Sequence, residues 1–402
     1  MSTDTSVDSS TPVPQRNALS RLWTDKESRS VIVQIIATAL IFALFYFMVT
    51  NAITNLERIG KGFSFDFLSQ PSNYDINQRL ISYDSRSSHL RAMQVGIINT
   101  LLVAVAGIIL ATILGFILGV LRLSKNWLTN KIAHVYIEYV RNVPVLLHIL
   151  LIHGIFVHNL PRPKSAIGIA DTAFLTNRGM FMPKPVPEPL MWAVIGLFFA
   201  GIVFAFLFRR WAKKVQDATG KIYPVFWISI LAIVVLPVIA YFLLGSPVQW
   251  DEPALKGFNF KGGMVIRPEF IALWLALSFY TAAFIGEVVR AGILAVSHGQ
   301  TEASMALGIP RNRTLNLVVI PQAMRVIVPP LSSQYLNITK NSSLAIAIGY
   351  MDITATIGGI SLNQTGREME CMLIVMALYL TFSLIISTFM NWYNSRIKLV
   401  ER

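Results

Sequence analysis

Glu302-Ala-Ser-Met-Ala-Leu-Gly308-Ile-Pro310-Arg-Asn-Arg-Thr-Leu-Asn-Leu-Val-Val-Ile-Pro321 is a polar stretch between two long apolar runs. Thr301 before it can cap a helix, and an acid follows in the first turn, where the helix dipole favours it. Gly308 stands where helices commonly end in a left-handed residue, and Pro310 suits the first turn of a second helix. Pro321 is expected to interrupt that second helix before the next apolar run. The stretch therefore predicts a compact elbow of helix, glycine corner and helix.

The composition places this elbow in a membrane protein. Of 402 residues, 54% are apolar and 14% are charged, whereas soluble domains have about 25% charged residues. Several apolar runs are long enough to span about 30 Å of hydrocarbon at ~1.5 Å per residue. The runs are 31–50, 95–121, 136–159, 190–208, 224–244, 268–296, 324–350 and 371–390. We therefore expect an all-α polytopic membrane protein with about eight transmembrane helices.

Three of these runs contain residues that are unusual for a simple membrane span. The run 136–159 is interrupted by Arg141 and three histidines, and Lys340 lies within the run 324–350. In the run 95–121, Gly115 and Gly119 are four residues apart, a spacing that lets two helices approach closely.

The net charge of +13 is concentrated in alternate loops. Loop 209–223 carries five basic residues and a single acid, and loop 122–135 has three basic residues and no acid. Loops 160–189 and 245–267 contain acids among their basic residues. This positive-inside distribution argues for a membrane orientation and against nucleic-acid binding. The elbow and both termini are therefore expected in the cytoplasm. The predicted cytoplasmic segments are 1–30, 122–135, 209–223, 297–323 and 391–402.

Further motifs surround the elbow. Upstream is Tyr280-Thr-Ala-Ala-Phe-Ile-Gly-Glu-Val-Val-Arg-Ala-Gly-Ile293, followed by Gly299-Gln300. Downstream are Pro321-Gln-Ala-Met-Arg325, Pro329-Pro330 and Lys340-Asn-Ser-Ser-Leu-Ala345. Earlier in the chain, residues 138–145 read Glu-Tyr-Val-Arg-Asn-Val-Pro-Val. Together with the elbow these motifs resemble the permease subunits of ATP-driven (ABC-type) importers, in their polar amino-acid (histidine/glutamine permease) subfamily. The chain is most similar to the enlarged general L-amino-acid importer permeases of Gram-negative bacteria.

The resemblance implies a division of the chain around a five-helix permease core. The predicted parts are a disordered tail (1–30), an extra transmembrane helix (31–50), a periplasmic segment (51–94), the first part of the core (95–160), an insertion with two extra transmembrane helices (161–267), the second part of the core with the coupling loop 297–323 (268–390), and a cytoplasmic tail (391–402).

The resemblance also implies that a separate ABC ATPase grips the elbow. The coupling residues carried over are Gly299, Gln300, Glu302, Ala303, Ser304, Gly308 and Pro321. Ser304 stands where the family motif has a second alanine, which preserves a small side chain. An ordinary amphipathic helix lying on anionic lipid is the alternative for this segment.

Two pairs of opposite charges lie within apolar runs. Glu287 and Arg290 are three residues apart on one helix face, and Glu138 and Arg141 have the same spacing. Charges at depth in a membrane are expensive, so we expect each pair to bind internally or to brace the elbow.

Lys340 has no acid within one turn of its own helix and is followed by Asn341, Ser342 and Ser343. A fixed cation beside hydroxyl groups suits the α-carboxylate of an amino acid, so we assign these four residues to the substrate pathway. The alternatives are that Lys340 pairs with an acid from another helix or extends toward the membrane surface.

The chain is not expected to be an enzyme. It has no Gly-x-x-x-x-Gly-Lys-Ser/Thr phosphate loop, and no cytoplasmic loop is long enough for a nucleotide-binding domain. A single cysteine and histidines spaced five apart predict no metal site. We therefore expect no bound cofactor, with ATP and Mg²⁺ used by the partner ATPase.

The resemblance implies the remaining partners and the location. These are a second permease subunit, for which the resemblance favours a related chain over a second copy, a periplasmic amino-acid-binding protein, an L-amino-acid substrate and the bilayer of a bacterial inner membrane. An ion-coupled secondary amino-acid transporter is the main alternative, although such transporters usually contain internal repeats and none is evident here. A membrane scaffold is a third possibility.

Overall fold

The computed structural model describes residues 26–58, 60, 62–170 and 172–397. In this part of the chain, seven helices are long and apolar enough to cross a membrane, and one bent pair of helices brings the number to eight. The prediction of about eight transmembrane helices is confirmed.

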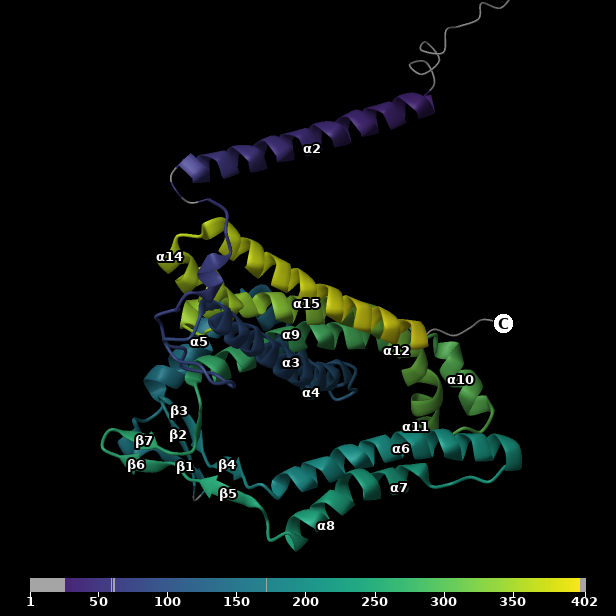
Figure 1. The fold of residues 1–402 in the computed structure, drawn as a ribbon. Helices are drawn as coiled ribbons and strands as arrows, with labels where there is room; N and C mark the ends of the chain where they lie inside the picture. Colours follow the sequence, from purple (N-terminus) through teal and green to yellow (C-terminus); the bar gives the residue numbers. More distant parts are fainter. Residues whose placement is uncertain (1–25, 59, 61, 171, 398–402) are drawn as a thin grey trace, which may run out of the picture.

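The core is a bundle built around two long helices, α3 (His89–Arg122) and α9 (Pro268–Leu294), which share the most extensive helix–helix contact. Helix α12 (Ile320–Asn341) packs against both, and α15 (Glu368–Ile397) packs against α12 (Figure 1). The buried side chains of this bundle are almost all aliphatic or small. The bundle therefore corresponds to the core expected from the runs 95–121, 268–296, 324–350 and 371–390.

Small residues let α3 and α9 approach closely. A Cβ atom at Gly119 would lie 2.6 Å from the side chain of Val289 and 2.8 Å from the carbonyl oxygen of Gly286. A Cβ atom at Gly115 would collide with Ile285 in the same way. The two glycines thus allow the α9 backbone to lie directly against α3, as their spacing predicted.

The prediction of one straight span over 136–159 is wrong, because the chain bends sharply within it. The chain instead forms α4 (Trp127–Asn142) and α5 (Val145–Gly154), with a π-helical turn η2 (Ile155–Asn159), and the two halves are bent by 104°. Pro144 causes the break, because the residue before a proline is driven out of the helical region. Val143 accordingly has φ −107° and ψ 131°.

Helix α2 (Lys26–Arg58) stands apart from the bundle (Figure 1), and none of its most apolar stretch is buried in the described structure. Residues 26–30, which we assigned to a disordered tail, are helical, and 1–25 lie outside the described residues. At the other terminus α15 continues to Ile397, so most of the predicted tail 391–402 is helical, and 398–402 lie outside the described residues.

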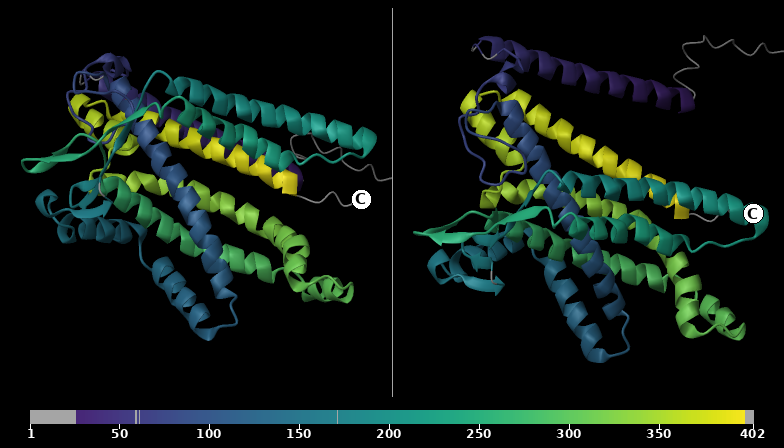
Figure 2. Two further views of the ribbon diagram at one scale, coloured as in Figure 1. Left: turned by 90° about the horizontal axis from the view of Figure 1, so that it is seen from below. Right: turned by 60° about the horizontal axis from the view of Figure 1, so that its bottom comes forward.

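The insertion contains a helical hairpin. Helix α6 (Met191–Thr219) packs against a second span formed by α7 (Val225–Ile230), the π-helical turn η4 (Leu231–Val235) and α8 (Leu236–Leu243). Figure 2 shows this hairpin running alongside the bundle. The two extra membrane helices expected in 161–267 are present.

The insertion also contains short β-strands that the sequence did not predict. They are β1 (Ile167–Ala170), β2 (Ala173–Thr176), β3 (Gly179–Met182), β4 (Lys184–Pro187), β5 (Val248–Asp251), β6 (Ala254–Lys256), β7 (Asn259–Lys261) and β8 (Met264–Ile266). Antiparallel pairing gives a sheet of order β1-β2-β3-β8, a pair β4-β5 whose strands flank the helical hairpin in sequence, and a β-hairpin β6-β7. Strands of three or four residues are too short to show a clear alternating pattern, so the reading missed them.

Polar connections gather at the end of the bundle opposite to the elbow (Figure 1). They comprise η1 (Asp66–Ser69), η3 (Pro163–Ser165), α13 (Ile353–Ala355), η7 (Thr356–Ser361) and α14 (Leu362–Thr365). A hydrogen bond from the Ser64 amide to the Glu370 carboxylate (3.0 Å) helps to hold the segment after α2 against the start of α15.

Because α3 and α9 approach closely, a side chain added at a glycine between them should lower stability more than one added at an exposed glycine. Gly119→Leu should destabilise the protein by about 1–3 kcal/mol, because the new side chain has no space between the helices. Gly196→Leu in α6 is the matched control, since no atom lies within 4 Å of a Cβ atom there. Thermal unfolding in detergent should show a lower Tm for the first variant only; an equal effect of both would contradict the packing.

Candidate functional site

The predicted elbow is present, with one boundary moved. Its first helix is α10 (His298–Ala306), with Ser297 at the N-cap position but without a side-chain cap hydrogen bond, so Thr301 lies inside the helix and is not its N-cap. The helix ends at Leu307, and Gly308 follows with φ 75°. The amides of Gly308 and Ile309 donate to the carbonyls of Met305 (2.9 Å) and Ser304 (3.1 Å). The left-handed glycine corner is therefore confirmed.

The second half of the elbow differs from the prediction at Pro321. Helix α11 (Arg311–Thr314), the π-helical turn η5 (Leu315–Val319), α12 and the 3₁₀-helix η6 (Ser342–Ile348) form one continuous helical span. Pro321 lies at the second residue of α12 and does not interrupt it. A proline clashes with the carbonyl one turn earlier, and the wider π-helical turn before Pro321 makes room for its ring.

The inner side of the elbow is held by polar side chains. Ser304 is buried, and its hydroxyl donates to the Gln300 carbonyl (2.8 Å). Thr314, in the second half, is also buried and its hydroxyl donates to the Ile309 carbonyl (3.3 Å). The Gln322 amide donates to the Gln300 side-chain oxygen (3.3 Å), which joins α10 to α12. Small hydroxyl residues thus close the corner from inside.

The outer side of the elbow is exposed. Gly299, Glu302 and Ala303 lie on the surface together with Met305 and with Leu307, whose side chain is 80% exposed. The His298 ring lies 2.9 Å from the Glu302 carboxylate, a pair that is itself exposed. An apolar side chain at the tip of a polar loop is suited to contact with another protein.

Only one of the two predicted charge pairs forms. The Arg290 guanidinium donates to the Glu287 carboxylate through Nε (2.8 Å) and through Nη2. Glu138 instead lies 4.0 Å from the His134 ring, while Arg141 stacks over the Phe284 ring at 5.5 Å. Arg141 thus contacts α9 directly, and the stacking replaces the expected pairing with Glu138.

The four residues assigned to the substrate pathway do not form one cluster. Lys340 is exposed at the end of α12, and Asn341 and Ser343 are half-buried. Ser342 is fully buried, and its hydroxyl donates to the Thr339 carbonyl (2.7 Å) and lies 3.4 Å from the Tyr379 hydroxyl. No hydrogen bond or ion pair from the Lys340 ammonium is formed within the described ranges.

The sequence reading missed a buried carboxylate next to this serine. Asp352 is completely buried; it accepts from the Ala355 amide (2.8 Å) and from the Tyr379 hydroxyl (3.0 Å). The Thr354 hydroxyl lies 3.2 Å from the same Tyr379 oxygen. We call Ser342, Asp352, Thr354 and Tyr379 the outer polar network. Asp352 caps α13. The signal that could have found it is an aspartate that follows the turn at Gly349 by three residues and directly precedes Ile353-Thr354-Ala355, as an N-cap residue does.

The start of α3 holds the outer polar network in place. The Asn99 side chain donates to the Met351 carbonyl (2.9 Å), and the Thr100 hydroxyl accepts from the Ile353 amide (3.1 Å). The His89 ring lies 2.7 Å from the Ser361 hydroxyl, which also lies 3.1 Å from that of Tyr74. Buried polar contacts of this kind specify one arrangement of the connection between α12 and α15.

Comparison with known proteins agrees with this architecture. Residues 198–399 match the protein family described as binding-protein-dependent transport system inner membrane component. The chain belongs to this family.

Three relatives match the permease over nearly its whole length. The general L-amino acid transport system permease protein AapQ of Rhizobium johnstonii is 45% identical over 94% of this chain and 94% of its own. The putative amino-acid ABC transporter permease protein YhdX of Escherichia coli is 46% identical over 93% and 95%. The glutamate/glutamine/aspartate/asparagine transport system permease protein BztB of Rhodobacter capsulatus is 46% identical over 96% and 97%.

Family membership decides several predictions. The permease is a multi-span inner-membrane component of an ABC importer and is not an enzyme. The ion-coupled alternative finds no support, since the relatives are permease subunits of ABC systems. The family also implies an ATPase and a binding protein as partners.

Burial raises the pKa of Asp352 to about 6, above its ordinary value of 3.8. The folded state thus holds this proton more tightly than the unfolded state, so the contribution of Asp352 to stability should fall as pH rises from about 4 to about 6. Asp352→Asn should flatten this part of the pH–stability curve while keeping the helix cap. Asp352→Ala should cost about 1–2 kcal/mol, because the cap is lost. Thermal unfolding from about pH 3.5 to 8 measures both; an unchanged slope between about pH 4 and 6 in Asp352→Asn would contradict the assignment.

Proposed function

We propose that this permease forms one half of the translocation pathway of an ATP-driven, binding-protein-dependent importer of L-amino acids with broad specificity. The observation that carries the proposal is the similarity to AapQ and BztB, which are named for general L-amino acids and for four acidic or amide amino acids. Coverage of 94–96% of the permease in these two matches includes the insertion as well as the core.

Residues 299–321 are the proposed contact with the ATPase, which binds ATP and Mg²⁺ and supplies the hydrolysis. The exposed apolar tip of the elbow at Met305 and Leu307 supports this assignment. The contact would push the rigid elbow when two ATPase subunits close on ATP.

The continuous helix from Arg311 to Ile348 supplies a route for this motion. It extends from the elbow to Ser342 in the outer polar network, which also contains Asp352. A displacement at one end of a stiff helix reaches the other end without a separate relay, so the elbow and the outer network can move together. We propose that Lys340, Asn341, Ser342 and Ser343, at this outer end, belong to the substrate pathway.

A second permease subunit is needed to complete the pathway, and we propose a related chain rather than a second copy. The elbow, the loop between α6 and α7, the start of α2 and the end of α15 lie toward the same end of the molecule (Figures 1 and 2). The basic residues of loop 209–223 support placing this end, with both termini, in the cytoplasm.

Capture of the ATPase tests the proposed coupling. Gly308→Val should distort the corner, because a β-branched residue is strained at φ 75°, whereas Gly308→Asn tolerates this conformation better. We expect the wild type and Gly308→Asn to retain a co-expressed ATPase in a pull-down and Gly308→Val to lose most of it.

No atom lies within 4 Å of a Cβ atom at Gly308, so the two variants differ through the backbone and not through a clash. Membrane insertion of all three proteins, measured by extraction from purified membranes, is the control. Absence of the ATPase from the wild-type complex would overturn the proposed function.

Cysteine labelling tests the orientation. In a Cys371→Ala background, Phe258→Cys and Ile222→Cys introduce thiols at two side chains that are 76% and 77% exposed, at opposite ends of the insertion. A membrane-impermeant maleimide should label Phe258→Cys in intact spheroplasts and Ile222→Cys only after permeabilisation. The reverse pattern would place the elbow outside the cell and exclude the proposed ATPase contact.

A further inference from the structure

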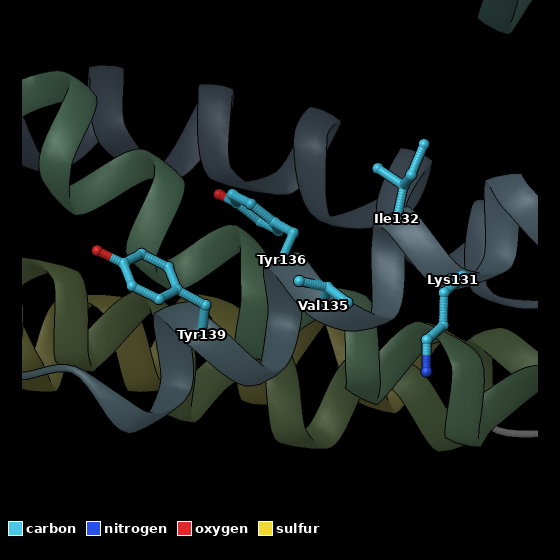
Figure 3. Close-up of a pocket in the computed structure, with 5 residues that line it drawn as sticks. All are labelled: Lys131, Ile132, Val135, Tyr136 and Tyr139. Carbon is cyan, nitrogen blue, oxygen red and sulfur yellow. The ribbon is translucent and has the colours of Figure 1, made fainter.

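Two of the hollows on the described surface differ in their chemistry. A groove of about 400 Å³ on α4 has walls that are mostly hydrocarbon, lined by Lys131, Ile132, Val135, Tyr136 and Tyr139 (Figure 3). A cavity of about 680 Å³ at the end of the bundle opposite to the elbow is lined mainly by polar side chains. We call it the outer cavity. Its volume lies in the range of small-molecule sites, about 300–1,000 Å³.

The walls of the outer cavity come from three segments that are far apart in the sequence. One is η1 with the residues that follow it, the second is the start of α3, and the third is the end of α14 with the residue before α15. Their polar side chains in the cavity include Asp66, Gln70, Asn73, His89, Gln364 and Arg367. The segment 51–94, which precedes the permease core, thus completes a cavity on the core.

The two charged side chains of the outer cavity are held by neighbouring groups. The Ser64 hydroxyl donates to the Asp66 carboxylate (2.6 Å), and the Ser64 amide donates to the buried Glu370 carboxylate. The Arg367 Nη1 atom donates to the Gly62 carbonyl and lies 3.5 Å from Glu370. Ser64 and Glu370 therefore fix the positions of the acid and the base relative to each other.

Asp66 and Arg367 both line the outer cavity, yet they form no ion pair with each other in the part of the chain that the structure describes. The Asp66 Oδ1 atom and the Arg367 Nε and Nη2 atoms make no hydrogen bond to another described residue. A ligand with one positive and one negative group can bind both side chains through charge-assisted hydrogen bonds. An ion of a single sign would leave one of the two charges without a partner.

The neutral part of the wall indicates the rest of the ligand. Gln70, Asn73 and Gln364 are exposed and line the outer cavity. An amide group both donates and accepts hydrogen bonds, so these three residues can bind either an amide or a carboxylate. The wall therefore favours a ligand whose side chain is short and polar over one whose side chain is large and apolar.

Hydrogen bonds connect the outer cavity to the outer polar network. The ring of His89, in the wall, contacts the Ser361 hydroxyl, which also contacts the Tyr74 hydroxyl. The Tyr74 hydroxyl donates to the Thr356 carbonyl (3.5 Å), and the Thr356 hydroxyl donates to the Asp352 carbonyl (2.8 Å). A molecule in the outer cavity thus lies beside the segment that carries Asp352.

We infer that the outer cavity binds an L-amino acid with a short polar side chain as its zwitterion, with Arg367 on the α-carboxylate and Asp66 on the α-ammonium group. The inference rests on the proposed function for the class of substrate. It adds an entry site, made of residues from this chain alone, ahead of the proposed pathway residues at the end of α12.

Protection of an introduced thiol tests the inference at the cavity itself. Gln364→Cys is made in the Cys371→Ala background, in permease co-purified with its ATPase and a second permease and without the binding protein. L-Glutamine should slow labelling by a polar maleimide about tenfold at ten times its Kd, because only about one site in eleven is then free. Asn77→Cys is the control thiol, since Asn77 is exposed and lies outside the cavity wall.

Two analogues test the recognition of both charges without altering the protein. L-Glutaminamide lacks the carboxylate, and N-acetyl-L-glutamine lacks the ammonium group. Each should need a concentration at least about tenfold higher than that of L-glutamine for half-protection, because each loses a charge-assisted contact.

Asp66→Asn should raise the half-protecting concentration of L-glutamine by about tenfold or more, because the charge is lost while the oxygen that accepts from Ser64 remains. Asp84→Asn is the matched control. Asp84 is an exposed aspartate of the same segment that accepts from a serine hydroxyl, that of Ser87 (3.0 Å), and it lies outside the cavity wall. It should leave protection unchanged.

Three results would overturn the inference: no protection by L-glutamine, equal protection by both analogues, or protection that Asp66→Asn does not weaken. Loss of binding-protein capture in Asp66→Asn with unchanged protection would make the cavity a protein contact and would overturn it as well. Each of these results leaves the proposed function standing if the wild type still captures the ATPase. Failure of that capture contradicts the proposed function, whatever the protection at Gln364→Cys.

Discussion

The close contact between α3 and α9 is the interaction on which the rest of the structure depends. In hydrocarbon the hydrophobic effect does not drive helices together, so they associate where small residues let backbones approach and dispersion contacts accumulate. Gly115 and Gly119 supply that approach; α4, α5 and α12 pack on the resulting pair, and α15 packs on α12. The outer end of α3 also holds the connection that follows α12, through Asn99 and Thr100.

A second constraint is the continuity of the helical span from Arg311 to Ile348. Three prolines lie within it, yet the π-helical turn η5 and the helices on either side keep the span intact. The exposed elbow and the buried outer polar network are therefore two ends of one element. This arrangement suits a transport subunit, because one element links the proposed ATPase contact at one end of the molecule to the outer polar network at the other end.

The accessory elements differ from the core in how they use apolar surface. Helix α2 and the hairpin of α6 with α7 and α8 expose most of their large apolar side chains, whereas α9 buries more than half of its most apolar stretch and α3 buries mainly small residues against it. Helix α4 is intermediate, with one face packed on the core and another left open. The core helices thus pack against one another within the chain, while the outer apolar faces are left exposed to lipid or to another subunit.

The sequence by itself determined the membrane class, the number of spans, the glycine corner at Gly308 and the close approach at Gly115 and Gly119. Each follows from a local rule: hydropathy over a window, or the backbone freedom and small size of glycine. Only the tertiary structure decided which partners the polar residues take. Arg141 stacks on Phe284 instead of binding Glu138, Pro321 is absorbed by a wider turn, and Asp352 meets Tyr379 of another helix. Such contacts join residues far apart in the chain, so their energies depend on packing that no local pattern records.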